Sequence, residues 1–347
     1  MIIDHCCDIH ADGLEHLSTI GALLSASQRT VVVAHQNADG DAVGSVVAWT
    51  SMLRRHTAAQ IDPLLPDGCP SDLDWLPLAA DIVDGSAQPD EAATLLAEAD
   101  VVVCSDFNTL SRTGCLQEAL ATTKAKKILI DHHRNPEVAA FDIVVSDHTI
   151  SSACELGYWV MRAIYGCNGF DTEAAMALYT GMRTDTGGMA FSNGQPSLYL
   201  ATAHLVQCGI DASEINRNIA NVFSPNRMRF WGYAMKDLLE IDSESGTALL
   251  PVSLSDMEAY GMTPAELTGL INDVMRIKDV ECAVLVREEE TRVRLSYRSK
   301  TTVNVDEMAR ALFAEAGGHL HAAGATSTLP FADTVAEVRN QLKALVR

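Results

Sequence analysis

The sequence predicts an α/β protein of two domains: an N-terminal domain with a doubly wound parallel sheet, followed by a smaller α+β domain. The chain has 347 residues, more than the usual domain length of about 100–200 residues. In the first half, short β-branched runs precede polar, glycine-containing turns and then helical patterns, as in buried parallel strands with crossover helices. In the last third, strand-like alternation is interspersed with helical stretches.

The elements of the first domain follow one another regularly. Strands are expected at residues 30–34, 101–104, 127–130 and 142–145, and helices at residues 42–55 and 152–164. This domain is expected to cover residues 1–190. Ligands of doubly wound sheets bind at the carboxyl ends of the strands, so the residues that follow each apolar run are the candidates for a site.

The rest of the chain is expected to form a connector and the second domain. Residues 191–240 are predicted to be a helical connector, whose Phe230, Trp231 and Tyr233 pack between the domains. The second domain is expected to cover residues 241–347. Its strands are predicted at residues 247–252, 282–286 and 292–297, and its helices at residues 264–277 and 305–314.

Composition limits the function classes. The chain is 48% hydrophobic and 20% charged, which is typical of a globular protein. It has neither an apolar run long enough to span a bilayer nor a secretory signal, so a cytoplasmic protein without membrane contact is expected. Nine cysteines without a C-x-x-C spacing indicate reduced thiols. A net charge of −21 disfavours long duplex nucleic acid, but bound cations still allow small phosphates.

Potential metal ligands follow each apolar run of the first half. They are His35, Asp39 and Asp41 around Gly40, then Asp106, then Asp131, His132 and His133, and finally Asp185 at the end of a helical stretch. Imidazoles and carboxylates together suit Mn²⁺ or Mg²⁺. The set is too large for one ion and predicts two cations, about 3.5–4 Å apart, that share a carboxylate and activate water for attack on a phosphate ester.

Each of these residues also has an ordinary structural explanation. An aspartate after a strand often only caps a helix, and a single histidine is often a core residue. Four such groups, three of them at matching strand ends and one at the end of a helical stretch, favour the metal site, because clustered carboxylates without positive charge repel one another. A group of Asp, His and Cys residues at positions 4–10 lies at a chain end and is assigned no role.

These motifs resemble those of the DHH phosphoesterases. Asp131-His132-His133 matches the DHH signature, and His35, Asp39, Asp41, Asp106 and Asp185 match the other motifs of that family in order. Residues 317–324 read Gly-Gly-His-Leu-His-Ala-Ala-Gly and look like the GGH-x-x-AAG motif of the DHHA1 domain. The resemblance covers nearly the whole chain and is strongest to the bifunctional oligoribonucleases and 3′-phosphoadenosine-5′-phosphate phosphatases.

The resemblance implies a role for each residue. His35, Asp39 and Asp106 would hold one cation, and Asp41, Asp106, His132 and Asp185 the other, with Asp106 as the bridge and Mn²⁺ favoured over Mg²⁺. As the catalytic residues, His133 would face the scissile phosphate as a hydrogen-bond donor or acid, and Asp131 would orient the histidines. Arg298, Gly317, Gly318 and His319 would bind substrate, with the glycines in a loop. Arg112, six residues after Asp106, is expected to contact the phosphate or to brace its loop.

Two departures from the family pattern are present. Ala38 stands where the first motif often has proline, which removes rigidity but no ligand, and Ala316 stands where the glycine motif often has a third glycine.

The expected substrate is a small nucleotide or a short oligonucleotide. The leading hypothesis is an exoribonuclease that releases mononucleotides and/or a phosphatase that removes the 3′-phosphate of 3′-phosphoadenosine-5′-phosphate. The alternatives are a phosphodiesterase for linear or cyclic signalling dinucleotides and, in another class, a nucleotide-binding regulator without activity. Pairing of two copies into a homodimer is left open by the sequence.

Overall fold

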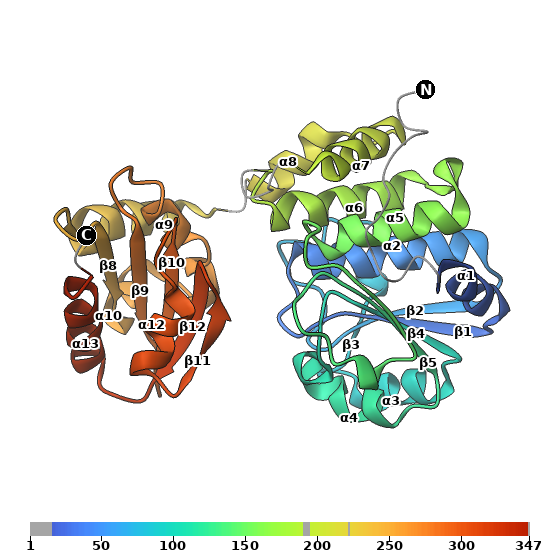
Figure 1. Cartoon of the computed structure of the whole chain (residues 1–347), viewed down its shortest axis with the longest axis horizontal. Coiled ribbons are helices and arrows are strands. Elements are labelled where there is room, and N and C mark those ends of the chain that lie inside the picture. Colours follow the sequence, from blue (N-terminus) through green and yellow to red (C-terminus); the bar gives the residue numbers. More distant parts are fainter. Residues whose placement is uncertain (1–15, 190–194, 221–222, 346–347) are drawn as a thin grey trace. The chain divides into compact units, whose positions relative to one another are not determined.

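The computed structural model describes residues 16–189, 195–220 and 223–345, apart from the side chains of residues 265 and 319. The chain divides into two compact units, Met1–Val222 and Phe223–Arg347, each of which is described by itself (Figure 1). The cluster at positions 4–10 and the expected domain end at residue 190 lie outside the described residues. Within the described part, no helix has the length and apolar character needed to cross a membrane.

The first unit is built on a six-stranded sheet in the order β3-β2-β1-β4-β5-β6, in which all neighbouring strands are parallel. The strands are β1 (Arg29–Val33), β2 (Gln60–Leu65), β3 (Val83–Asp84), β4 (Val101–Ser105), β5 (Lys126–Asp131) and β6 (Ile143–Ser146). The predicted doubly wound parallel sheet is therefore confirmed. The strand order reverses direction between β1 and β4, which is where such sheets bind ligands.

Helices cover both faces of this sheet, so its strands are apolar on both sides (Figure 1). One face carries α1 (Leu17–Ala26), α2 (Gly40–His56), α5 (Ala153–Tyr165) and α6 (Thr172–Asp185), and the other carries α3 (Pro89–Glu98) and α4 (Gln117–Thr122). In β1, Val32 joins the core on the α2 side while Val31 and Val33 join the opposite core. This alternation is the side-chain period of a strand.

The second unit contains a mixed sheet in the order β11-β12-β10-β9-β8-β7. Its strands are β7 (Glu240–Asp242), β8 (Thr247–Val252), β9 (Cys282–Glu288), β10 (Val293–Ser299), β11 (Glu315–His319) and β12 (Ala322–Ser327). Strands β8 and β9 are parallel, and the other neighbours are antiparallel. The helices are α9 (Pro225–Tyr233), η7 (Ala234–Leu238), α10 (Leu254–Tyr260), η8 (Pro264–Leu267), α11 (Leu270–Val274), α12 (Val305–Leu312) and α13 (Phe331–Lys343). This confirms the α+β expectation.

The range predicted as a connector is divided between the two units. Helices α7 (Pro196–Gln207) and α8 (Ala212–Ala220) place Leu198 and Ile215 in the core of the first unit. Phe230 and Trp231 of α9 are buried in the core of the second unit instead of packing between domains as expected. Other aromatic side chains of this unit pack against them. For example, the ring centroid of Tyr260 on α10 lies 5.6 Å from that of Phe230.

Two further elements differ from expectation. The helix predicted at residues 264–277 is interrupted, because Gly269 adopts φ +93° and separates η8 from α11. The glycine motif, expected to be a loop, forms most of the strand pair β11–β12, with Gly317 opposite Gly324. Small residues let these two strands approach closely, which outweighs the low strand propensity of glycine.

Candidate metal centre

The first ligand group comes from the turn between β1 and α2. Asp39 is the N-cap of α2, and its Oδ1 accepts hydrogen bonds from the backbone N–H groups of Asp41 at 3.0 Å and of Ala42 at 3.1 Å. Asp39 therefore does cap a helix, and both hydrogen bonds of the cap go to its Oδ1 oxygen. The cap holds the carboxylate beside His35, which directly precedes this turn and is 6% exposed.

The buried carboxylate of Asp41 is aimed by a helix that is distant in sequence. Its Oδ2 accepts a 2.7 Å hydrogen bond from the N–H of Ala153, and its Oδ1 accepts a 2.9 Å bond from the N–H of Cys154. Both donors lie at the N-terminus of α5, where unpaired N–H groups favour an anion. Sequence reasoning missed this support. Its signal was the Ser152-x-x-Glu155 spacing, which is typical of a helix start.

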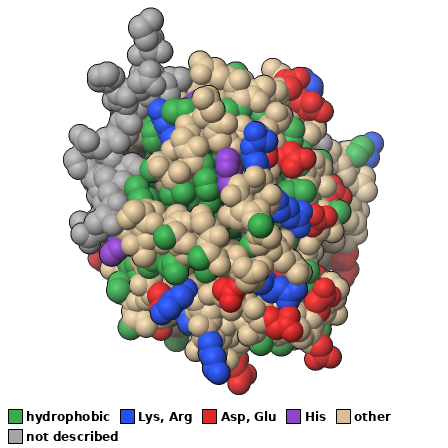
Figure 2. Space-filling view, turned by 90° about the vertical axis from the view of Figure 1, so that its right-hand side faces the viewer, with side chains coloured by type: hydrophobic (Ala, Val, Ile, Leu, Met, Phe, Trp, Pro, Cys, Tyr) green, Lys and Arg blue, Asp and Glu red, His purple; other side chains and the backbone are tan. Residues whose placement is uncertain are grey.

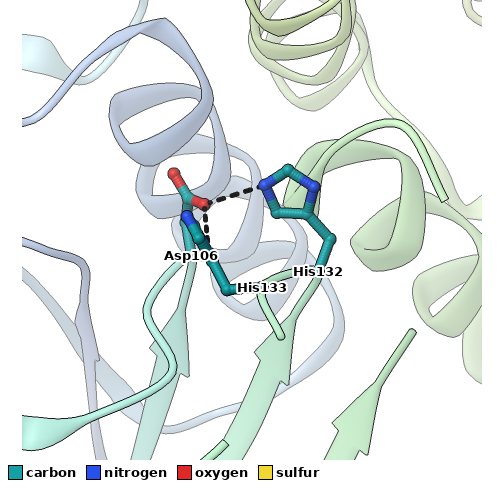
Figure 3. Close-up of side chains that lie close together, drawn as sticks. All are labelled: Asp106, His132 and His133. Carbon is teal, nitrogen blue, oxygen red and sulfur yellow. Dashed lines mark ion pairs between the residues drawn. The ribbon is translucent and has the colours of Figure 1, made fainter. Parts of the chain in front are cut away.

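Asp106 lies at the centre of the cluster. It follows β4 with φ +64°, a left-handed conformation that aspartate adopts more readily than most residues. Its carboxylate oxygens lie 3.3 Å from His35 Nε2, 3.5 Å from His132 Nε2 and 3.7 Å from His133 Nδ1, and Figure 3 shows the last two contacts. Because Asp106 is 2% exposed, the three imidazoles surround a carboxylate that water barely reaches.

The donor atoms form three overlapping groups. In each group one ligand atom of every residue lies within 4.8 Å of the others: His35, Asp39 and Asp106; Asp41, His132 and Asp185; and Asp106, His132 and His133. The first two groups match the two ligand sets implied by the resemblance, apart from the shared Asp106, which lies 3.5 Å from His132. Carboxylates and imidazoles are the donors that suit Mn²⁺ or Mg²⁺. The residues present therefore fit two divalent cations.

His133 is held from both sides of its ring. Its Nδ1 lies 2.7 Å from Asp131 Oδ1, and its Nε2 lies 2.8 Å from Arg112 Nη1. Since a guanidinium only donates, Nε2 accepts and Nδ1 carries the hydrogen that is donated to Asp131. In this arrangement Arg112, and not His133 Nε2, presents hydrogens beside the cluster. Asp131 is fully buried, and its Oδ2 also accepts the backbone N–H of His133 at 3.1 Å.

Arg112 also contacts the turn that carries the first ligands, because its carbonyl accepts the N–H of Gln36 at 2.8 Å. We expect Arg112→Ala to lower kcat roughly ten- to a hundredfold, the usual range for a residue that supports metal ligands. Steady-state hydrolysis measures this effect. Arg112→Lys keeps the charge but not the fixed fork of donors, so partial recovery is expected. An unchanged kcat in the alanine variant would rule out the supporting role.

Burial and mutual charge shift the pKa values within the cluster. Burial raises the pKa of Asp41 well above its ordinary value, and the charges of Asp106 and Asp185 add to the effect. Burial also raises the pKa of Asp185, to about 6. Burial opposes the charged form of His132, yet its hydrogen bond to Asp106 and the neighbouring carboxylates raise its pKa to about 10. The carboxylates therefore need positive charge, from protons or from cations, to lie this close together.

Binding of Mn²⁺ is expected to release protons and to tighten from about pH 6 to about pH 8. Metal ligands must be deprotonated, whereas His132, with its pKa raised to about 10, carries a proton across this range, and Asp185 carries one in part near pH 6. Apparent affinity should rise about tenfold per pH unit for each proton displaced. Calorimetry in buffers of different ionisation enthalpy counts these protons; pH-independent affinity without proton release would contradict the assignment.

The residues expected to bind substrate lie in the second unit. Arg298 on β10 and His319 on β11 are both paired with Ala322 of β12 in the strand register. Arg298 Nη1 donates to the carbonyl of Tyr297 at 2.9 Å, and burial lowers the pKa of Arg298. A Cβ on Gly318 would lie 2.3 Å from the carbonyl oxygen of Ala322, so this position requires glycine. The side chain of His319 lies outside the described part of the structure.

Comparison with known proteins agrees with this arrangement. The model of the DHH family, N-terminal domain, matches residues 29–182, and that of the DHHA1 domain matches residues 251–347. The chain is 27% identical to the "Bifunctional oligoribonuclease and PAP phosphatase NrnA" of Bacillus subtilis over 65% of this chain and 69% of that protein. It is 25% identical to the Thermus thermophilus protein of the same name over 90% of this chain and 88% of the relative.

A solved structure has a closely similar fold. The exopolyphosphatase-related protein from Bacteroides fragilis is 28% identical and superposes with a TM-score of 0.91, over 95% of this chain and 96% of that chain. The first family model covers all residues of the metal cluster except Asp185, which follows its end at residue 182. The second covers the glycine motif of the second unit. The chain therefore belongs to the DHH family of phosphoesterases, with a DHH domain followed by a DHHA1 domain.

Proposed function

We propose that this chain hydrolyses short oligoribonucleotides to mononucleotides and/or removes the 3′-phosphate of 3′-phosphoadenosine-5′-phosphate. The observation that carries the proposal is the overlap of three donor groups, two of which contain Asp106, at the point where the strand order of the sheet reverses. The two relatives named as bifunctional oligoribonucleases and phosphatases support the choice of substrate.

The chain's own residues would position the reaction. His35, Asp39 and Asp106 would hold one cation, and Asp41, Asp106, His132 and Asp185 the other, so that Asp106 is shared. When bound, two such cations, Mn²⁺ in this proposal, would supply an activated water and positive charge to stabilise the phosphate oxygens. Arg112, whose Nη1 donates to His133 at 2.8 Å, would add a donor fork beside the phosphate.

Surface charge supports a small substrate. On the face shown in Figure 2, Lys and Arg side chains are interspersed with Asp and Glu side chains. Together with the net charge of −21, this is unfavourable for a long duplex, which needs a continuous basic surface. We accordingly propose a small nucleotide or short oligonucleotide as the partner.

The test is a substrate panel with added Mn²⁺. It contains a short oligoribonucleotide, 3′-phosphoadenosine-5′-phosphate, linear and cyclic dinucleotides, and pyrophosphate, and it measures released mononucleotide and phosphate. Turnover of the first two substrates, lost in Asp106→Ala, supports the proposal. Preference for a cyclic dinucleotide, or no turnover despite bound metal, would refute it, the second result in favour of a nucleotide-binding regulator.

A further inference from the structure

A pocket of about 430 Å³ adjoins the metal cluster on the side of the edge strand β6. It shares His133 with the cluster, and its size lies within the usual range for small-molecule sites. Its lining also includes Arg134, Pro136, Val138, Val144 and His148. The pocket is therefore continuous with the site but lies beyond the metal ligands.

Hydrogen bonds fix the loop that forms this pocket. Asn108, two residues after Asp106, donates from Nδ2 to the carbonyl of Arg134 at 2.8 Å and accepts the N–H of Glu137 on its own carbonyl at 2.8 Å. The carboxylate of Glu137 in turn accepts the N–H of Leu110 at 3.2 Å. The loop after β5 is thus tied to the loop after β4, so the pocket and the bridging carboxylate keep a fixed relation.

The charge of the pocket is opposite to that of the chain. No acidic residue is among those that line it, although the chain carries 46 Asp and Glu residues against 25 Lys and Arg. Arg134 and His148 are exposed there, and among the described residues no hydrogen bond or ion pair involves either side chain. Pro136, Val138 and Val144 add an apolar wall. A free guanidinium beside an apolar wall suits a phosphate attached to a nucleoside.

The two proposed substrates contain a common fragment that matches this pocket. In both 3′-phosphoadenosine-5′-phosphate and a 5′-phosphorylated oligoribonucleotide, the scissile phosphorus can be bonded to the 3′-oxygen of a nucleoside 5′-phosphate. Hydrolysis forms a bond from the water oxygen to phosphorus and breaks the bond from phosphorus to the 3′-oxygen. The 3′-oxygen gains the proton that the water loses, so both reactions release a nucleoside 5′-phosphate.

We propose that this pocket binds the leaving nucleoside 5′-phosphate, with Arg134 contacting its 5′-phosphate and the apolar wall contacting the nucleoside. Arg134 directly follows His133, and consecutive Cα atoms are about 3.8 Å apart, so its side chain starts beside the cluster. In this proposal the metal cluster contacts the scissile phosphate, and Arg134 contacts the 5′-phosphate of the same small molecule. The inference rests on the proposed function and adds to it the requirement for a 5′-phosphate on the nucleoside. Inorganic pyrophosphate contains no nucleoside and therefore does not meet this requirement.

The experiment compares two diadenosine substrates, pApA and ApA, which differ only in the 5′-phosphate. With Mn²⁺, wild-type protein is expected to show a kcat/KM for pApA that exceeds that for ApA by roughly ten- to a hundredfold, the range of a charge-assisted hydrogen bond. Arg134→Gln should remove this difference by raising KM for pApA, with ApA hydrolysis unchanged. The matched control is Arg55→Gln, an exposed arginine on α2, which should change neither value.

A binding measurement separates this inference from the proposed function. Without added metal, 5′-AMP should bind the wild-type protein and Arg55→Gln equally and Arg134→Gln at least about tenfold more weakly. Equal losses for pApA and ApA, or no loss for either, together with unchanged 5′-AMP binding, would overturn the assignment of the pocket. Failure of wild-type protein to hydrolyse either dinucleotide would overturn the proposed function, whereas 5′-AMP binding that depends on Arg134 would still support the pocket.

Discussion

Replacing Asp106 with asparagine is expected to lower phosphoester hydrolysis by roughly a thousandfold or more. Asp106 contacts His35, His132 and His133 and takes part in two of the three donor groups. The asparagine amide keeps the shape of the side chain but loses the negative charge that two cations would share. Cations stabilise such transition states by several kcal/mol. Each tenfold change in rate corresponds to about 1.4 kcal/mol. Steady-state turnover of pApA with Mn²⁺ measures the loss.

The matched control is Asp142→Asn. Asp142 is an exposed carboxylate that precedes β6 at the opposite end of the strands, where its Oδ1 lies 2.7 Å from Lys126 Nζ. Surface ion pairs contribute little, so turnover should stay within about twofold of wild type. Calorimetry should also show fewer bound Mn²⁺ ions per chain for the Asp106 variant than for the control. Wild-type turnover in the Asp106 variant would exclude its bridging role.

Gly181→Ala is expected to destabilise the first unit by about 1–3 kcal/mol and to weaken metal binding as well. A Cβ at this position of α6 would lie 2.2 Å from Cys154 Sγ and 2.8 Å from Asp41 Oδ1. Cys154 is fully buried, and its own Cβ would be only 2.9 Å away, so α5 and α6 must separate. This separation would move Asp41 relative to His132. Urea unfolding and Mn²⁺ titration measure the two effects.

Gly157→Ala is the control for this substitution. Gly157 lies in the interior of the neighbouring helix α5, and a Cβ there would meet its nearest atom, Trp49 Nε1, at 3.4 Å, an ordinary contact distance. Because alanine favours helix by up to about 1 kcal/mol over glycine, the control should be neutral or stabilising. If Gly181→Ala were as stable as the control, with unchanged Mn²⁺ affinity, the close packing of α6 on Asp41 would not control the site.

The sequence by itself predicted the sheet and the grouping of the metal ligands. His35, Asp106 and His132 lie far apart in the chain, but each follows an apolar, β-branched run. Parallel strands carry their carboxyl ends to one edge, so three residues at equivalent strand ends must meet. Strand β2 was harder to recognise, because Pro63 in its middle argues against a central strand. In the structure Pro63 pairs with Val32 of β1, and the pairing with β3 begins only at Leu64.

Only the tertiary structure decided how these residues are oriented and what surrounds them. Asp41 is aimed by the N–H groups of Ala153 and Cys154, more than a hundred positions away in the chain. The hydrogen on His133 Nδ1 follows from the position of Arg112. Such contacts depend on how helices and loops that are far apart in the sequence pack together. Local patterns of hydrophobicity and turn residues therefore do not predict them. For the same reason, the pocket beside His133 becomes visible only after the loops following β4 and β5 have come together.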